Sequence, residues 1–126
     1  MKQKRGINIK KIIYIFLIVL FIILLFTLGD YFVHMIKKEY SVPSYYFRNK
    51  IIFGTLIGFL SFLFIRKMKP LKKSLIFSLT ISVLLQIRYF LEGYSKEFVF
   101  IFLFIHFLIL FPITLIIFKL FNKYIK

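Results

Sequence analysis

The stretch IIYIFLIVLFIILLFTL, residues 12–28, decides the fold, because its 17 residues carry no charge. A helix needs about 20 mainly apolar residues to cross the hydrocarbon core of a bilayer, so this stretch predicts a membrane span. Basic residues in front of an apolar run are also typical of a signal peptide. This run is longer than the apolar part of a usual signal peptide and three more runs follow, so we expect it to be retained as a span.

Three further apolar stretches follow, each bounded by charged residues. The second, residues 51–65, covers only about 22 Å, so we expect it to begin earlier, with Arg48 and Lys50 directing their charges outward along their aliphatic stems. Turns of about eight residues join the last three stretches, which makes those helices antiparallel neighbours. The sequence therefore predicts an all-α polytopic membrane protein, a single domain over residues 1–126 with four transmembrane helices in an up-down antiparallel bundle. The predicted spans are residues 12–28, 48–65, 74–90 and 98–118.

The composition identifies lipid as the solvent of these helices. Hydrophobic residues make up 61% of the 126 residues and aromatic residues 21%, more than a soluble domain of this length can bury. The net charge of +15 would suit nucleic acid, but Lys and Arg stand at the ends of apolar stretches and not along one basic face. We expect the partners to be the lipid bilayer and its anionic headgroups, and no nucleic acid. The chain has no cysteine, which excludes disulfides and thiolate chemistry.

The distribution of charge predicts the orientation. With the N-terminus inside, the inner side carries 13 cations and no acid, whereas the outer side carries six cations and all four acids. Because positive charge accumulates in cytoplasmic loops, the prediction is an N-in/C-in, multi-pass protein of the cell membrane. The inner cations are Lys2, Lys4, Arg5, Lys10, Lys11, Arg66, Lys67, Lys69, Lys72, Lys73, Lys119, Lys123 and Lys126.

The longest connection, residues 29–50, carries apolar residues at helical spacing. We expect the first helix either to continue to about Tyr40 or to lie down on the membrane surface. Pro43 then ends it, and Ser44 is a candidate N-cap of the second helix.

Two stripes of small residues are candidates for helix packing, because small side chains allow close approach of helices in lipid. One lies on the second span and the other on the third, and antiparallel helices could bring the two stripes face to face. The stripes could pack within one chain or form a dimer interface. They consist of Gly54, Gly58 and Ser61, and of Ser74, Ser78 and Ser82.

Gln86, Arg88 and His106 are expected at similar depth in the outer half of the membrane, with Asp30 at the outer end of the first span. His34 lies one helical turn beyond Asp30, and Glu92 one turn beyond Arg88. Together these six polar residues form a candidate binding cluster: Asp30, His34, Gln86, Arg88, Glu92 and His106. An arginine at this depth needs a partner, and Asp30 and Glu92 are the candidates. Arg88 could therefore snorkel, join two helices through an ion pair, or bind an anionic group such as a lipid phosphate.

His106 is the most deeply placed ionisable residue. It could mark a functional site, or it could bond Gln86, Ser82 or a carbonyl freed by Pro112 as a plain contact between helices. Asp30 and His34 have the i, i+4 spacing of two metal ligands, but the sequence defines no third ligand. We therefore assign no metal, no cofactor and no catalytic residue.

The size and four-span layout resemble small multidrug transporters and fluoride channels, which work as dimers. The glutamate of such transporters is missing from the first span, which has no charge between Lys11 and Asp30, and so is the glycine-rich segment with arginine of such channels. The sequence therefore favours a non-catalytic membrane protein with a lipid-binding, accessory or assembly role, able to form a homo-oligomer or to join another membrane protein. The alternatives are a small oligomeric transporter or channel, with Arg88, His106 and Gln86 along its path, and an enzyme acting on membrane lipids.

Overall fold

The computed structural model describes residues 8–126, which form helices and contain no strand. Four of the helices are long and apolar enough to cross a membrane. The basic residues Lys2, Lys4 and Arg5, expected on the inner side, lie outside the described residues. The four long helices are α1 (Ile9–His34), α2 (Ser44–Ile65), α3 (Pro70–Leu91) and α4 (Lys96–Leu120). The short 3-10 helix η1 (Lys38–Tyr40) precedes α2, and the single turn α5 (Asn122–Ile125) ends the chain.

Each long helix extends beyond the span predicted for it, because local capping signals and not hydropathy set its ends. At the start of α1, the Asn8 side chain accepts a hydrogen bond from the backbone amide of Lys11 at 2.8 Å. Ser95 plays the same part for α4, accepting from the amide of Phe98. Proline opens α3 at Pro70, where its missing amide costs nothing.

The C-terminus of α3 requires a glycine. Gly93 has a φ of +100°, in the left-handed region that side chains disfavour. The Gly93 amide donates to the carbonyl of Phe90, and the Tyr94 amide donates to the carbonyl of Tyr89. This paired arrangement is a Schellman motif, and it turns the chain sharply from α3 toward α4.

The connection between α1 and α2 differs from both expectations. Helix α1 ends at His34, and the chain then turns through η1 back toward the bundle. Ser44 does not cap α2 with its side chain; Pro43 occupies the N-cap position and Ser44 is the first helical residue. The turn matters for the site described below, because it brings the backbone carbonyl of Tyr40 to His34.

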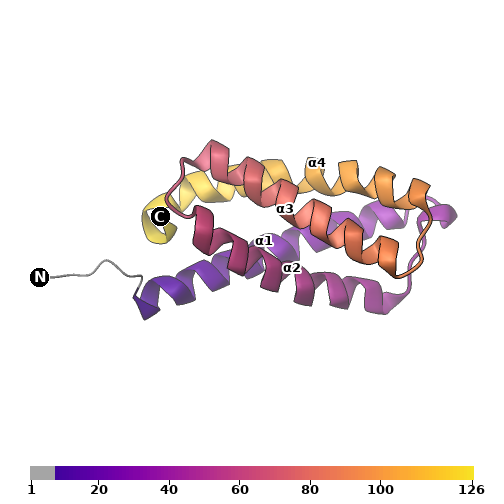
Figure 1. The fold of residues 1–126 in the computed structure, drawn as a ribbon, viewed down its shortest axis with the longest axis horizontal. Helices are drawn as coiled ribbons and strands as arrows, with labels where there is room; N and C mark the ends of the chain where they lie inside the picture. Colours follow the sequence, from indigo (N-terminus) through magenta and orange to yellow (C-terminus); the bar gives the residue numbers. More distant parts are fainter. Residues whose placement is uncertain (1–7) are drawn as a thin grey trace, which may run out of the picture.

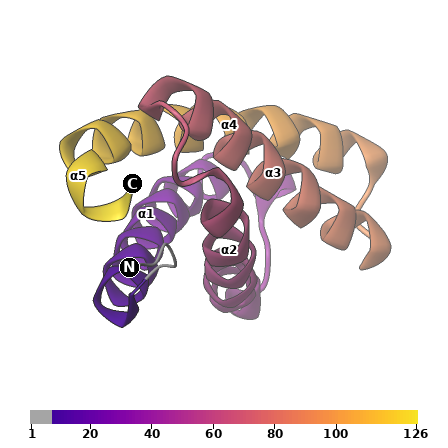
Figure 2. The same cartoon turned by 60° about the vertical axis from the view of Figure 1, so that its left-hand side comes forward.

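The four long helices pack as a bundle. Neighbours in the chain contact each other, and α1 also contacts α4 and α5. Figure 1 shows the α1–α2 and α3–α4 connections at one end of the bundle, and the α2–α3 connection with the C-terminus at the other. The turned view of Figure 2 shows the α3–α4 pair lying across the α1–α2 pair, with α5 folded back toward α1.

The small-residue stripe of α2 packs on α1 and α3, and the stripe of α3 contacts α4 at Ser78. Gly58 lies at the junction of three helices, where an added Cβ would come within 3.0 Å of Val19, 3.1 Å of Phe77 and 3.2 Å of Ile81. Ser78 in contrast hydrogen-bonds Thr114 of α4 at 3.1 Å. The serine stripe is fully buried at Ser74, Ser78 and Ser82, whereas Ser61 is only partly buried.

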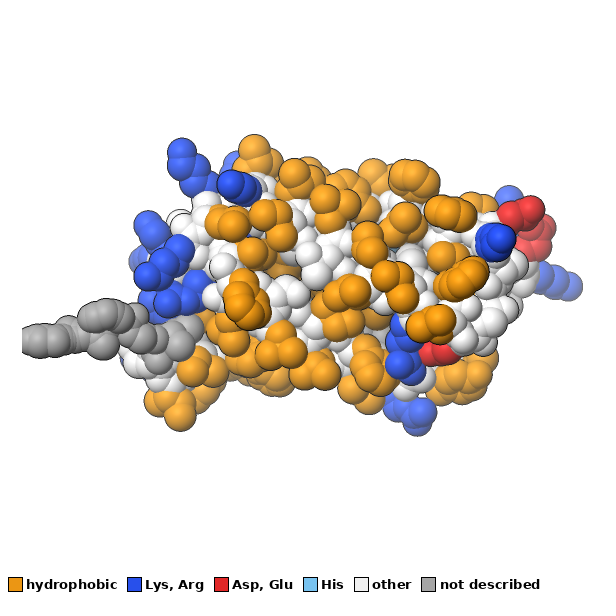
Figure 3. All heavy atoms as spheres, viewed as in Figure 1, with side chains coloured by type: hydrophobic (Ala, Val, Ile, Leu, Met, Phe, Trp, Pro, Cys, Tyr) orange, Lys and Arg blue, Asp and Glu red, His pale blue; other side chains and the backbone are white. Residues whose placement is uncertain are grey.

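The surface divides into an apolar band and two charged ends. Figure 3 shows hydrophobic side chains over the middle of the molecule, basic side chains at the end nearest the chain termini, and basic and acidic side chains toward the other. Large apolar side chains stay exposed along all four long helices, among them Phe64, Phe104 and Leu108. A belt of this kind is typical of a surface that contacts lipid chains.

Candidate functional site

A buried polar cluster formed by Asp30, His34, Lys50 and His106 lies at the end of the bundle that holds the α1–α2 turn. Asp30 and His34 come from the last turns of α1, Lys50 from the second turn of α2, and His106 from α4. Asp30, Lys50 and His106 have no exposed surface. Ionisable groups cut off from water must pair with one another, and Asp30 is the only acid in the cluster.

Lys50 lies inside the cluster, so the expectation that it snorkels outward is wrong. Its ammonium is in direct contact with the Asp30 carboxylate. It also lies 3.2 Å from the hydroxyl of Tyr46 and 2.9 Å from Nε2 of His106. An ammonium has three N–H donors, and these three acceptors match them. Lys50 therefore ties α2 to both α1 and α4.

His34 is held in one orientation by the turn that follows α1. Its Nδ1 lies 2.6 Å from the backbone carbonyl oxygen of Tyr40. Because a carbonyl only accepts hydrogen bonds, Nδ1 carries the proton and donates it. Nε2 then points to the Asp30 carboxylate, 3.1 Å from Oδ2. The ring also stacks on Phe102 of α4, with centroids 4.2 Å apart.

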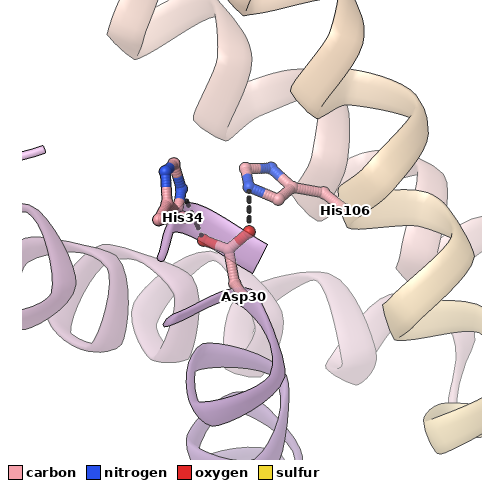
Figure 4. Close-up of side chains that lie close together, drawn as sticks. All are labelled: Asp30, His34 and His106. Carbon is pink, nitrogen blue, oxygen red and sulfur yellow. Dashed lines mark ion pairs between the residues drawn. The ribbon is translucent and has the colours of Figure 1, made fainter. Parts of the chain in front are cut away.

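His106 approaches the same carboxylate from the opposite helix. Its Nε2 lies 3.2 Å from Asp30 Oδ1, while the contact of His34 is with Oδ2. Figure 4 shows the two imidazoles converging on the carboxylate, one from α1 and one from α4. Nδ1 of His106, Nε2 of His34 and Oδ1 of Asp30 are all buried and have no hydrogen-bond partner among residues 8–126.

Aromatic rings wall the cluster. The Lys50 ammonium lies 4.4 Å from the centroid of the Tyr46 ring and 5.2 Å from that of Phe26, which suits a cation–π contact. Tyr46 in turn stacks on Tyr89 at 4.7 Å. Tyr94, in the turn after α3, packs against both tyrosines, and its partial burial raises the pKa of its phenol. These rings exclude water and so strengthen the electrostatic contacts inside.

The structure divides the six residues of the predicted cluster into two groups. Asp30, His34 and His106 come together, whereas Arg88 and Glu92 form an i, i+4 pair on the outside of α3, with Nε 2.9 Å from Oε2. Gln86 is buried but belongs to neither group: its side-chain amide donates to the backbone carbonyl of Val99 at 2.7 Å. Among the described residues, His106 forms no hydrogen bond with Gln86 or Ser82; its polar partners are Asp30 and Lys50.

Sequence reasoning missed Lys50, Tyr46 and the Tyr40 carbonyl. A signal for the first two was present, because positions 46, 50, 54 and 58 repeat every four residues and lie on one helical face. If Gly54 and Gly58 pack against other helices, Lys50 shares their buried face. The Tyr40 contact depends on the course of an irregular turn and has no comparable signal.

Comparisons with known proteins give this chain no relative. No family model, no curated protein and no solved structure matches it. Its function must therefore be inferred from three features. These are the buried cluster around Asp30, the Arg88–Glu92 pair on α3, and the exposed apolar side chains of the four long helices.

Proposed function

We propose that the protein is a non-catalytic, multi-pass protein of the cell membrane with a lipid-binding, accessory or assembly role. Its four apolar helices form an up-down bundle with both termini on the cytoplasmic side. The bias of 13 inner to six outer cations supports this orientation. The Asp30–Lys50 contact serves as a lock between the first two helices.

The observation that carries the lipid-binding role is the position of Arg88. Its guanidinium stacks on the ring of Phe53 in α2, 3.8 Å from the centroid, and its side chain remains 37% exposed. It borders a groove of about 510 Å³ between α2 and α3, the Arg88 groove, lined by Phe53, Ile57, Leu84, Ile87, Arg88, Leu91 and Glu92.

The chemistry of the Arg88 groove matches a phospholipid. Apolar side chains line most of it and suit an acyl chain, while the guanidinium at its outer end suits a phosphate. Stacking on Phe53 fixes the guanidinium plane, so less entropy is lost when a phosphate binds. Glu92 engages Nε of Arg88, so the terminal N–H groups of the guanidinium stay available to donate to the phosphate of an anionic lipid.

Native mass spectrometry from nanodiscs tests this role. Nanodiscs containing phosphatidylglycerol and phosphatidylcholine are compared for the wild type and for Arg88→Gln. Arg48→Gln, which removes an exposed outer cation from α2, is the matched control. We expect phosphatidylglycerol to remain bound to the wild type and to Arg48→Gln, and to be lost from Arg88→Gln. Equal retention by all three proteins would contradict the proposal.

The alternative, a small oligomeric transporter or channel, is favoured by a different observation. Ionisable residues buried at membrane depth often mark the route of an ion or proton, and Asp30, Lys50 and His106 are fully buried. Reconstitution into liposomes separates the two proposals: movement of protons or cations that stops in Asp30→Asn would support transport. Intact liposomes with no flux at any imposed gradient would count against it.

A further inference from the structure

We propose that Asp30, His34 and His106 form a binding site for one divalent transition-metal ion, with Lys50 as the cation that occupies its place when no metal is bound. The site goes beyond the lipid-binding role and does not depend on it. Two nitrogen donors and one carboxylate oxygen suit Zn²⁺, Co²⁺ or Ni²⁺.

The first argument is the convergence of donor atoms. One ligand atom from each of Asp30, His34 and His106 lies within 4.8 Å of the other two. Nε2 of His34 lies 3.1 Å from Oδ2 of Asp30, and Nε2 of His106 lies 3.2 Å from Oδ1, so each histidine approaches a different oxygen of the one carboxylate. Ligands of a tetrahedral zinc ion with bonds near 2.05 Å stand about 3.3 Å apart. Side-chain adjustments of about 1–2 Å would bring three donor atoms that lie within 4.8 Å of one another to that spacing.

The second argument is the orientation of His34. A metal-binding histidine almost always donates its other ring N–H to a carbonyl or carboxylate, which fixes the tautomer. The Nδ1 of His34 has this partner in the Tyr40 carbonyl. The lone pair of Nε2 is thereby directed toward the Asp30 carboxylate, where an acceptor would face an acceptor. A cation between them converts this repulsion into two bonds.

The third argument is the set of buried atoms without partners. Nε2 of His34 and Oδ1 of Asp30 both point into the cluster, and neither has a hydrogen bond within the described part of the chain. Their residues are 4% and 0% exposed. Buried polar atoms in native proteins are nearly always satisfied, so these two point to a ligand that supplies positive charge.

Lys50 shows that the position attracts a cation. Its ammonium contacts Asp30 and His106, two of the three proposed ligands. A divalent ion and an ammonium cannot share this space, so metal binding displaces Lys50 toward the tyrosines that flank it. The rings of Tyr46 and Tyr89 lie 4.4 and 5.7 Å from the ammonium and can receive it.

A route for the ion is present at His34. A cavity of about 210 Å³ lies beside the α1–α2 turn, and His34, Ser41, Ser44 and Phe47 are among its lining residues. Ser41 and Ser44 are exposed, so the cavity reaches the molecular surface. An ion entering there meets His34 first and the Asp30 carboxylate next.

Cobalt titration of the detergent-solubilised full chain tests the site. His34 and His106 are the two histidines of the sequence, so a protein carrying a tag without histidine reports on this site through the visible absorption of Co²⁺. We expect one Co²⁺ per chain, displaced by Zn²⁺. His34→Gln and His106→Gln should weaken binding at least about tenfold, since loss of an outer partner alone has that effect. Glu97→Gln, which removes an exposed carboxylate from the same end, should bind as the wild type does.

The Lys50→Met variant should change the affinity for Co²⁺ in the opposite direction to the histidine variants. Removal of a like charge near the ion should strengthen Co²⁺ binding at least about tenfold. Arg48→Met loses the same charge from an exposed position on the same helix and should leave the affinity unchanged. If a histidine variant does not fold, the melting temperature of the wild type with and without Zn²⁺ replaces it, and we expect Zn²⁺ to raise that temperature. Wild-type protein that binds no Co²⁺, or binding that neither histidine variant weakens, would overturn the proposal.

Discussion

The ammonium of Lys50 in α2 is in direct contact with the carboxylate of Asp30 in α1, and neither side chain has any exposed surface. The two residues are 20 positions apart and lie on either side of the α1–α2 turn. Their contact therefore fixes how α1 and α2 sit against each other. It also makes each charge dependent on the other, because an unpaired charge at this depth is costly.

The first prediction concerns this pair. Asp30→Asn should lower the free energy of unfolding by about 3 kcal/mol, because it leaves the Lys50 ammonium buried without a counter-charge. The double variant Asp30→Asn/Lys50→Met should recover part of the loss, since no uncompensated charge remains. Thermal unfolding in detergent, followed by circular dichroism, measures both. If the loss of stability in the double variant equals the sum of the losses in Asp30→Asn and Lys50→Met measured singly, the two residues do not interact.

The second prediction concerns helix packing at Gly58. A Cβ at this position would lie 3.0 to 3.2 Å from side chains of α1 and α3, so Gly58→Ala should destabilise the protein by about 1–3 kcal/mol through overpacking. Gly29→Ala is the matched control, because its nearest contact of 3.4 Å, to Ile109, is an ordinary one. Equal melting temperatures for Gly58→Ala and the wild type would show that the three-helix junction accommodates a methyl group without overpacking, and would contradict the prediction.

The third prediction concerns the turn at Gly93. Because its φ of +100° strains any side chain, Gly93→Ala should cost about 1 kcal/mol although no atom lies within 4 Å of the new Cβ. Gly93→Asn should cost less, since asparagine tolerates this conformation better than other side chains do. The melting temperatures of the two variants give the comparison. If Gly93→Ala melted at a higher temperature than Gly93→Asn, backbone strain at position 93 would not explain the loss of stability.

The fourth prediction concerns orientation in the membrane. Single cysteines placed at Lys67 and at Ser95 can be tested with an impermeant maleimide on intact cells, because the chain has no cysteine of its own. With both termini inside, the reagent should label position 95 in the α3–α4 turn and not position 67 in the α2–α3 turn. Labelling after cell lysis confirms that both cysteines are reactive. The reverse pattern would invert the proposed topology.

Hydropathy was sufficient to predict the four apolar helices, since residues 12–28, 48–65, 74–90 and 98–118 all fall within observed helices. The ends were harder to predict. Each depends on one or two capping residues such as Asn8 or Gly93, and a window average over many residues does not detect them. The turn at residues 35–43 was the least predictable part, because its conformation depends on contacts with other helices.

The candidate site was predicted only in part, and helical geometry explains the difference. At 100° per residue, Arg88 lies about 200° around α3 from Gln86, so the two side chains could not face the same cluster. Lys50 was taken for a surface residue because lysine usually snorkels, although its four-residue spacing from Gly54 placed it on the buried face. Position along the helix axis alone placed Arg88 in the same cluster as His106. The angular position of Arg88 around α3 would have separated the two.

The unequal lengths of the four long helices affect how the molecule fits a bilayer. Helices α1 and α4 have 26 and 25 residues, or about 38–39 Å, whereas α2 and α3 have 22 residues each, or about 33 Å. These lengths exceed a hydrocarbon core of about 30 Å by about 8–9 Å for the longer pair and by about 3 Å for the shorter pair. A helix takes up such an excess by tilting or by extending its ends into the headgroup region. Each helix pair, α1–α2 and α3–α4, therefore joins one longer and one shorter helix, so a bilayer meets a similar mismatch of length in both pairs.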